Sequence, residues 1–233
     1  MDNKLAYDRT VVFDESKLRE EHRQVLEWVG SNKSVLEIGC HTGYFSAVLS
    51  QKSNTVTGVE IYEPALEKAK PYLKQAVLGN IEHEEVWNQV SQSTYDVILF
   101  MHVLEHLVAP EIILQKFKQL LKPNGIIIVC LPNINNWHNR VDMLKGNFTY
   151  TEQGIMDKTH LKFYNYFSAR KLLEDAGLQV LGYSGVSWRV RFKIVPDRWV
   201  ATKINDVFNN LLLKILSPNI TDKVTMYKAG LKN

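Results

Sequence analysis

Five apolar runs alternate with amphipathic segments between Val35 and Leu131, and this alternation restricts the fold more than any other feature of the chain. The runs occupy residues 35–39, 55–60, 76–79, 95–101 and 126–131. Helical patterns fall at residues 44–50, 64–73, 82–90 and 110–121. Strands that alternate with helices of this length build a parallel sheet covered on both faces. The sequence therefore predicts an open α/β sheet.

Further elements are predicted on either side of this unit. Upstream, Ser16 is placed to cap a helix that continues through Trp28. Downstream, the pattern predicts helices over 168–176 and 199–216 and strands over 178–183 and 223–228. We expect a single domain over residues 1–233. It includes an N-terminal helical cap over residues 1–34 and a loop-rich insertion on the substrate side over residues 133–165.

Charge is unevenly distributed, although the net charge is only +3. Residues 1–130 carry 13 Lys and Arg against 17 Asp and Glu, and residues 131–233 carry 15 against 8. The basic second half is compatible with an anionic partner, but such charge runs are more commonly solvated faces. The basic residues form no dense cluster with interleaved aromatic rings, so no nucleic-acid partner is expected.

No apolar run approaches the ~20 residues that a membrane span requires. The first residues are polar and acidic, unlike a signal peptide. The two cysteines, Cys40 and Cys130, lie far apart, and each stands at the end of an apolar run, as expected of buried thiols in a reducing compartment. We therefore expect a cytoplasmic protein without a membrane span. The sequence gives no indication of its oligomeric state.

The turn in VLEIGCHTGYF (residues 35–45) directly follows the first run. In an open parallel sheet the ligand lies beyond the carboxyl ends of the strands, beside the first one. Gly39 and Gly43 would let the backbone approach such a ligand closely. Glu60, at the end of the second run, is placed to accept hydrogen bonds from two ribose hydroxyls.

Charge distinguishes between the candidate ligands of this turn. A dinucleotide or nucleoside triphosphate would require G-x-G-x-x-G or a Lys beside the turn. Position 41 is His instead, and no Lys or Arg falls between Lys33 and Lys52. Glu37 would repel phosphate and suits a cation, such as the sulfonium and ammonium groups of S-adenosylmethionine. A turn without any ligand is the alternative, since glycine-bearing turns are common.

Five segments resemble, in order and spacing, the class I S-adenosylmethionine-dependent methyltransferases. They are VLEIGCHTGYF, VTGVEIYEPAL, GNI at 79–81, YDVILFMHVLEHL and LLKPNGIIIVCLPN. The resemblance implies a Rossmann-like sheet of seven strands, mostly parallel with an antiparallel final strand. It also implies S-adenosylmethionine as the cofactor.

The same resemblance implies which residues bind the cofactor. They are Glu37, Gly39, Cys40, His41 and Gly43 around the methionine end, Glu60 and Ile61 at the ribose, Asn80 and Ile81 at the adenine, and Met101 and His102 over the methionine part. His41 and Asn80 depart from the glycine and aspartate that many members have. Residues 132–180 further resemble bacterial methyltransferases associated with surface-polysaccharide or O-antigen biosynthesis, which implies a small-molecule or glycan acceptor.

Residues 102–106 also match H-x-x-E-H, the inverted zinc-peptidase pattern. The pattern directly follows an apolar strand, so His102 belongs to the strand-to-helix corner, and no later acidic helix offers a third ligand. We therefore expect no metal. The resemblance instead implies that Glu105 and His106 form the floor of the substrate pocket.

Asp157 and His160 lie in the polar segment GIMDKTHLKFY. An Asp near a His can orient an imidazole that takes a proton from a substrate hydroxyl. A loop held together by local hydrogen bonds is the alternative. We predict that His106 or His160 is the general base and that Asp157 orients it. Two functions stay open: an O-methyltransferase, and a cofactor-binding but catalytically silent module.

Overall fold

The computed structural model of the 233-residue chain describes residues 18–187 and 216–232. The predicted cap at Ser16 and all but the last residue of the helix predicted over 199–216 lie outside the described residues. Cys40 and Cys130 are both buried free thiols. None of the helices in the described ranges is long and apolar enough to cross a membrane.

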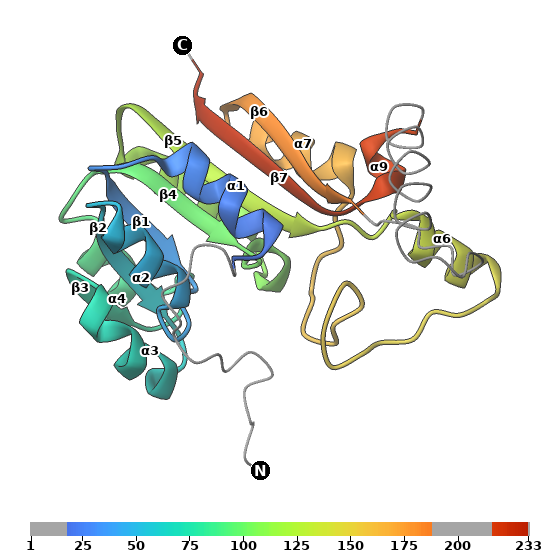
Figure 1. The fold of residues 1–233 in the computed structure, drawn as a ribbon, viewed down its shortest axis with the longest axis horizontal. Coiled ribbons are helices and arrows are strands. Elements are labelled where there is room, and N and C mark those ends of the chain that lie inside the picture. The colour runs from blue at the N-terminus through green and yellow to red at the C-terminus, as the bar shows by residue number, and fades with distance from the viewer. Residues whose placement is uncertain (1–17, 188–215, 233) are drawn as a thin grey trace, which may run out of the picture.

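Seven strands form one sheet in the order β3-β2-β1-β4-β5-β7-β6 (Figure 1). Their bounds are β1 Ser34–Ile38, β2 Thr55–Glu60, β3 Gln75–Leu78, β4 Tyr95–Met101, β5 Leu121–Pro132, β6 Leu178–Ser187 and β7 Asp222–Leu231. Strands β1 to β5 pair in parallel, whereas β7 runs antiparallel to both β5 and β6. The predicted fold class, with its antiparallel final strand, is confirmed.

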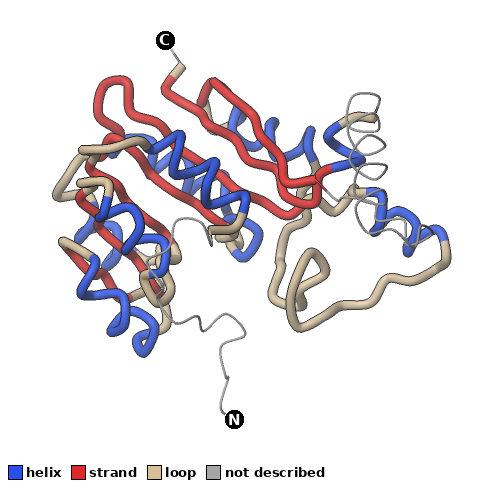
Figure 2. Tube along the Cα trace, in the orientation of Figure 1, coloured by secondary structure: helices blue, strands red, loops and turns tan. Residues whose placement is uncertain are grey.

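Helices cover both faces of the sheet (Figure 2). One face carries α1 Glu20–Val29 and α2 Tyr44–Gln51, with α3 Glu63–Ala69 beside α2. The other face carries α4 Glu84–Val90, α5 Pro110–Phe117 and α7 Tyr166–Asp175. Because successive strand residues point to opposite faces, Ile98 and Val97 of β4 pack into different cores. Continuous apolar runs are therefore the expected signal for these doubly covered strands.

The turn predicted at residues 122–125 lies inside β5. It shifts the pairing register between β4 and β5. Tyr95 pairs with Leu121, but Val97 pairs with Ile126. Asn124, which lies between Leu121 and Ile126 in β5, has a φ of 62°. The strand assignment therefore continues through an irregular turn of the backbone, and the regular ladder begins at Ile126.

The insertion over residues 133–165 contains a helix that the sequence analysis did not predict, α6 Trp137–Leu144. The side chain of Asn136 caps it by accepting hydrogen bonds from the backbone N–H groups of His138 and Asn139. No residue of α6 is buried. Its apolar residues Trp137, Val141 and Leu144 do recur at helical spacing, but a helix of eight residues repeats the pattern too few times to be a clear signal. The rest of the insertion is largely irregular and returns beside the sheet (Figure 1).

Candidate functional site

A cavity of about 1670 Å³ lies at the carboxyl ends of the parallel strands and extends to the insertion. Its wall includes thirteen of the fourteen residues predicted for the site, namely Glu37, Gly39, Cys40, His41, Glu60, Ile61, Asn80, Ile81, Met101, His102, His106, Asp157 and His160. Gly43 is the exception. Segments far apart in the sequence therefore meet at one cavity.

The turn after β1 has a left-handed backbone at Gly39 (φ 73°) and at His41 (φ 49°). A Cβ on Gly39 would lie 2.9 Å from Val103 Cγ2, so position 39 needs glycine for space as well as for conformation. Position 41 needs only the left-handed conformation, which His adopts more readily than most residues. The Nε2 atom of His41 is buried without a hydrogen-bond partner among the described residues, so a ligand in the cavity could satisfy it.

Gly43 supports the packing of helices. It has a φ of 75°, and a Cβ there would lie 2.7 Å from the Cα atom of Ala69 in α3. Its glycine lets α2 begin in close contact with α3. This differs from the predicted place at the methionine end of the cofactor, since Gly43 does not line the cavity.

Glu60 joins the end of β2 to the first turn. Its Oε2 accepts a hydrogen bond from the backbone N–H of His41 (2.9 Å), and its Oε1 accepts from those of Ile61 (2.9 Å) and Tyr62 (3.0 Å). A carboxylate oxygen has two acceptor positions. Oε1 is therefore filled, and Oε2 keeps one position, enough for a single ribose hydroxyl rather than the two predicted.

Glu37 is a buried carboxylate, 5% exposed, in the wall of the cavity. Its Oε2 accepts a hydrogen bond of 2.5 Å from the hydroxyl of Ser46. Burial raises the pKa of Glu37 to about 7, and the charge of Glu60 raises it further against the effect of Ser46. A cation in the cavity would favour its charged form. A buried carboxylate in this wall is suited to a positively charged ligand group.

Two residues of the cavity wall fit the nucleoside part of such a ligand. Ile61 is 67% exposed, which offers an apolar surface for a flat ring. The side-chain oxygen of Asn80 accepts a hydrogen bond from the backbone N–H of Glu82 at 2.9 Å. This contact orients the amide, and its NH₂ group and second oxygen position are suited to the edge of an adenine.

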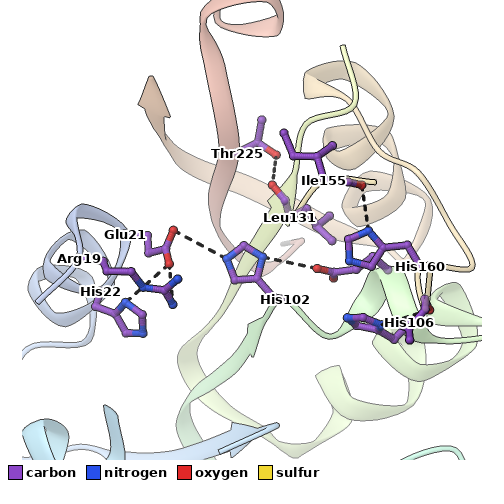
Figure 3. Close-up of polar contacts among 11 residues, drawn as sticks. Arg19, Glu21, His22, His102, His106, Leu131, Ile155, His160 and Thr225 are labelled. Carbon is purple, nitrogen blue, oxygen red and sulfur yellow. Dashed lines mark hydrogen bonds and ion pairs between the residues drawn. The ribbon is translucent and has the colours of Figure 1, made fainter. Parts of the chain in front are cut away.

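On the insertion side of the cavity, the imidazoles of His106 and His160 pack edge to face, with ring centroids 4.8 Å apart (Figure 3). His106 lies in the short 3-10 helix η3 (Leu104–His106). Its Nδ1 lies 3.2 Å from the carbonyl oxygen of Thr159, and Nδ1 of His160 lies 3.1 Å from that of Ile155. Because a carbonyl only accepts, Nδ1 is the donor in each contact, and Nε2 is the ring nitrogen that stays available to a ligand.

Asp157 contacts Thr159 rather than a histidine ring. Its Oδ1 accepts hydrogen bonds from the backbone N–H (2.8 Å) and the hydroxyl (2.7 Å) of Thr159. Burial acts to raise the pKa of Asp157, but these two bonds outweigh it and hold the pKa below its ordinary value. The Thr159 hydroxyl oxygen in turn lies 3.2 Å from Nδ1 of His106. The predicted orientation of an imidazole by Asp157 is therefore indirect, through Thr159, and concerns His106 rather than His160.

His102 lies at the corner after β4, with a φ of 57°, and two acidic residues face it. Its Nε2 is 3.8 Å from Glu21 Oε2, and its Nδ1 is 3.5 Å from Glu105 Oε1 (Figure 3). Burial acts to lower the pKa of His102, but Glu105 and Glu21 together raise it to about 9. His102 is therefore a cation at neutral pH.

Sequence reasoning did not identify the contribution of α1 to this wall. Glu21 is buried and forms an ion pair of 2.8 Å with Arg19. Both residues line the cavity. No local pattern places them there, because their position depends on how α1 packs across β6 and β7, which follow it by more than 150 residues in the chain.

Comparison with known proteins identifies a family and several similar proteins. The sequence model of a family described as "Methyltransferase domain" matches residues 11–182. A ubiquinone biosynthesis O-methyltransferase of Acinetobacter baylyi is 26% identical over 193 residues, which are 77% of this chain and 79% of that protein. The corresponding protein of Azoarcus sp. is 23% identical over 177 residues, covering 72% and 76%.

Solved structures share the fold at low sequence identity. An S-adenosylmethionine-dependent methyltransferase from Archaeoglobus fulgidus has a TM-score of 0.61 and 16% identity, with 90% of both chains covered. A magnesium protoporphyrin IX methyltransferase from Synechocystis, solved with bound S-adenosylhomocysteine, has a TM-score of 0.56 and 15% identity, covering 91% of this chain and 82% of that one.

Proposed function

This chain belongs to the methyltransferase-domain family and is an S-adenosylmethionine-dependent methyltransferase, and from this premise we propose that it methylates a hydroxyl group of a small-molecule acceptor. The observation that carries the proposal is the pair of imidazoles on the insertion side of the cavity. In both His106 and His160 a backbone carbonyl holds Nδ1, so Nε2 is the ring nitrogen available to an acceptor hydroxyl. A hydroxyl must lose a proton when it is methylated, and such groups are suited to accept it.

Bound S-adenosylmethionine supplies a methyl group on a positively charged sulfur. In the proposed site Glu37 complements the positive charge, while Glu60 and Asn80 hold the ribose and the adenine. An acceptor hydroxyl beside the cofactor would take this methyl group from the sulfur, and Nε2 of His106 or His160 is placed to take the hydroxyl proton. The chain contributes alignment, exclusion of water and a proton acceptor.

Burial lowers the pKa of His160, although the nearby Glu105 acts in the opposite direction. A neutral imidazole at physiological pH is the form that accepts a proton. Asp157 has the supporting role, because it orients Thr159 beside His106.

Two arguments bear on the acceptor. The relatives are named O-methyltransferases of ubiquinone biosynthesis, which supports oxygen as the accepting atom. The resemblance of residues 132–180 to methyltransferases associated with surface polysaccharides supports a glycan, and the basic second half of the chain supports an anionic group on it. We propose a hydroxyl of a glycan or other small molecule that carries such a group.

The test is to incubate the protein with labelled S-adenosylmethionine and matched acceptors: sugar phosphates and nucleotide sugars, their deoxy analogues, phenols and amines. We expect S-adenosylhomocysteine to form with a hydroxyl acceptor and not with its deoxy analogue. Methyl transfer to amines alone would contradict O-methylation. Cofactor binding without product from any acceptor would instead favour a catalytically silent module.

A further inference from the structure

Glu105, His106 and His160 place one carboxylate oxygen and two imidazole nitrogens around a single point of the cavity wall. One ligand atom from each lies within 4.8 Å of the others. We propose that these three side chains bind a divalent transition-metal ion whose open coordination positions face the acceptor. The proposal rests on the function proposed above, because it concerns the part of the cavity assigned to the acceptor.

Glu105 gives the first argument, because its carboxylate is buried without adequate partners. The side chain is 1% exposed, and neither oxygen has a hydrogen-bond partner among the described residues. Its contact with Nδ1 of His102, at 3.5 Å, is an ion pair that is longer than a good hydrogen bond. Protonated His102 therefore pairs with Oε1 only, and Oε2 is buried without a partner among the described residues. A buried carboxylate oxygen is unfavourable unless it is hydrogen-bonded, paired or bound to a metal, and a cation in the cavity would supply the missing contact.

The two imidazoles give the second argument. A histidine that binds a metal through one ring nitrogen commonly donates the other N–H to a backbone carbonyl or carboxylate. His106 and His160 have this arrangement, with Nδ1 held by the carbonyls of Thr159 and Ile155. With Nδ1 held by a carbonyl, Nε2 is the ring nitrogen of each side chain that is available to a metal.

The backbone fixes the two segments that supply these ligands. The carbonyl of Glu105 accepts hydrogen bonds from the N–H groups of Leu161 (2.8 Å) and Lys162 (3.0 Å). The loop that carries His160 is thus attached to η3, which carries Glu105 and His106. Ligands bound at about 2.0–2.2 Å stand roughly 3–3.5 Å apart, so the side chains must approach by on the order of 1 Å.

The donor set indicates the kind of ion. Two imidazoles and one carboxylate suit Mn²⁺, Fe²⁺, Co²⁺ or Zn²⁺, whereas Mg²⁺ and Ca²⁺ prefer oxygen ligands alone. The set also differs from the H-x-x-E-H peptidase pattern. His102 is not a ligand here, since its two ring nitrogens face Glu21 and Glu105. The third ligand, His160, comes from a loop that no short motif could indicate.

A metal at this point changes how the acceptor loses its proton. Coordination to a divalent ion lowers the pKa of a bound hydroxyl, so the oxygen becomes a better nucleophile near neutral pH. The imidazoles would then be ligands, and the hydroxyl proton would pass to solvent water instead of to an imidazole. The two roles of the histidines are distinguishable, because only one of them requires a metal.

The test uses the full chain without an affinity tag, stripped with a chelator and titrated with Co²⁺ and Mn²⁺, with Mg²⁺ for comparison. Co²⁺ absorption and calorimetry report binding. We expect about one Co²⁺ per chain, binding at least tenfold weaker in Glu105→Gln and His160→Gln, and no change in Glu111→Gln. Glu111 is an exposed acid of α5, so its variant makes the same charge change away from the site. Binding of S-adenosylhomocysteine by every variant serves as the folding control.

Failure of this proposal is separable from failure of the proposed function. Absent Co²⁺ binding, or equal binding by Glu105→Gln and the unsubstituted chain, would overturn the metal site. So would full turnover of a hydroxyl acceptor by the stripped protein with no response to added metal, and this result would leave O-methylation standing. Metal binding that depends on Glu105 and His160, in a protein that methylates no hydroxyl, would support the metal site and contradict the proposed function.

Discussion

Glu37 lies inside a buried strand, where a carboxylate is unfavourable unless a positive charge comes to it. Its only hydrogen bond among the described residues is the one from Ser46. The same carboxylate distinguishes a cationic cofactor from a phosphate-bearing one. Glu37 therefore lowers the stability of the free protein and favours binding of a cationic ligand. Such a trade of stability for function is common at functional sites.

The first prediction follows from the pKa of Glu37, about 7 in the folded protein against an ordinary value of 4.5. The folded state holds this proton more tightly than the unfolded state, so the carboxyl lowers stability progressively as pH rises from 4.5 to 7. Relative to the unsubstituted chain, Glu37→Gln should raise the free energy of ligand-free unfolding by up to about 3 kcal/mol at pH 8. The gain should disappear near pH 4.5.

Denaturant unfolding at both pH values measures this difference, and calorimetry measures the affinity for S-adenosylmethionine. We expect the affinity of Glu37→Gln to fall at least tenfold at pH 8. A stability difference that is the same at both pH values would show that the charge of Glu37 is not its cause.

The second prediction separates binding from turnover. Glu60→Ala removes the acceptor of three backbone N–H groups and of the ribose, so it should weaken cofactor binding by tenfold or more. His160→Ala should leave cofactor affinity nearly unchanged and slow turnover by about 100-fold. Calorimetry and initial rates measure the two effects. The reverse pattern would contradict the assigned roles.

At the scale of single elements, the turn after β1 does two things. Its residues 39–42 line the cavity, and Gly43 begins α2. Gly43 begins α2 in a left-handed conformation and in close contact with Ala69. Gly30, which ends α1, also has a positive φ of 72°, but its ψ of −146° lies outside the left-handed helical region, and a Cβ at that position would have no atom within 4 Å among the described residues. Backbone conformation alone therefore favours glycine at position 30, whereas packing against α3 adds to the requirement at position 43.

The third prediction concerns Gly43. Gly43→Ala should cost about 1–2 kcal/mol of unfolding free energy for a left-handed alanine. It should cost about 1–3 kcal/mol more, because the added methyl group meets the backbone of α3. Urea unfolding of the variant and the unsubstituted chain measures the loss. A loss of only about 1 kcal/mol would refute the packing role of Gly43.

The elements also show why the sequence predicted the sheet better than the insertion. Each strand of the sheet carries its own apolar run, and each covering helix carries its own stripe, so local patterns suffice. The exposed helix α6 is only eight residues long, so its apolar spacing repeats too few times to identify it. The turn inside β5 and the ion pair between Glu21 and His102 depend on pairing and packing between distant segments, which no local pattern contains.

The predicted site residues divide in the same way. Those in or just after the last residues of strands, such as Glu37, Glu60 and His102, come to one edge of the sheet because parallel strands end together there. The grouping of His160 with Glu105 and His106 requires the loop over residues 155–162 to close onto η3, and this closure is visible only in the structure. The expectation of a metal-free site depends on short motifs, which contain no information about that closure.

At the scale of the whole molecule, the cavity joins two functions that come from different parts of the chain. The ends of β1, β2 and β4 supply the predicted cofactor residues, whereas η3 and the insertion supply the residues proposed to act on the acceptor. Changes in the insertion can therefore alter the acceptor while the cofactor residues stay the same. Acceptor range should depend mainly on the insertion, because loops at strand ends commonly determine specificity.

The last prediction concerns the choice of cofactor by the whole chain. Glu37 and Glu60 line the cavity, and the turn after β1 offers no Lys or Arg to a phosphate. S-adenosylhomocysteine at 100 times its Kd should stabilise the protein by about 2.7 kcal/mol. For a chain of this size that gain corresponds to a rise in Tm of about 5–10 °C. NAD at the same concentration should give no rise, since its two phosphates would face these carboxylates. A thermal scan with each ligand measures both shifts, and a rise with NAD alone would overturn the assignment of the turn to a cation.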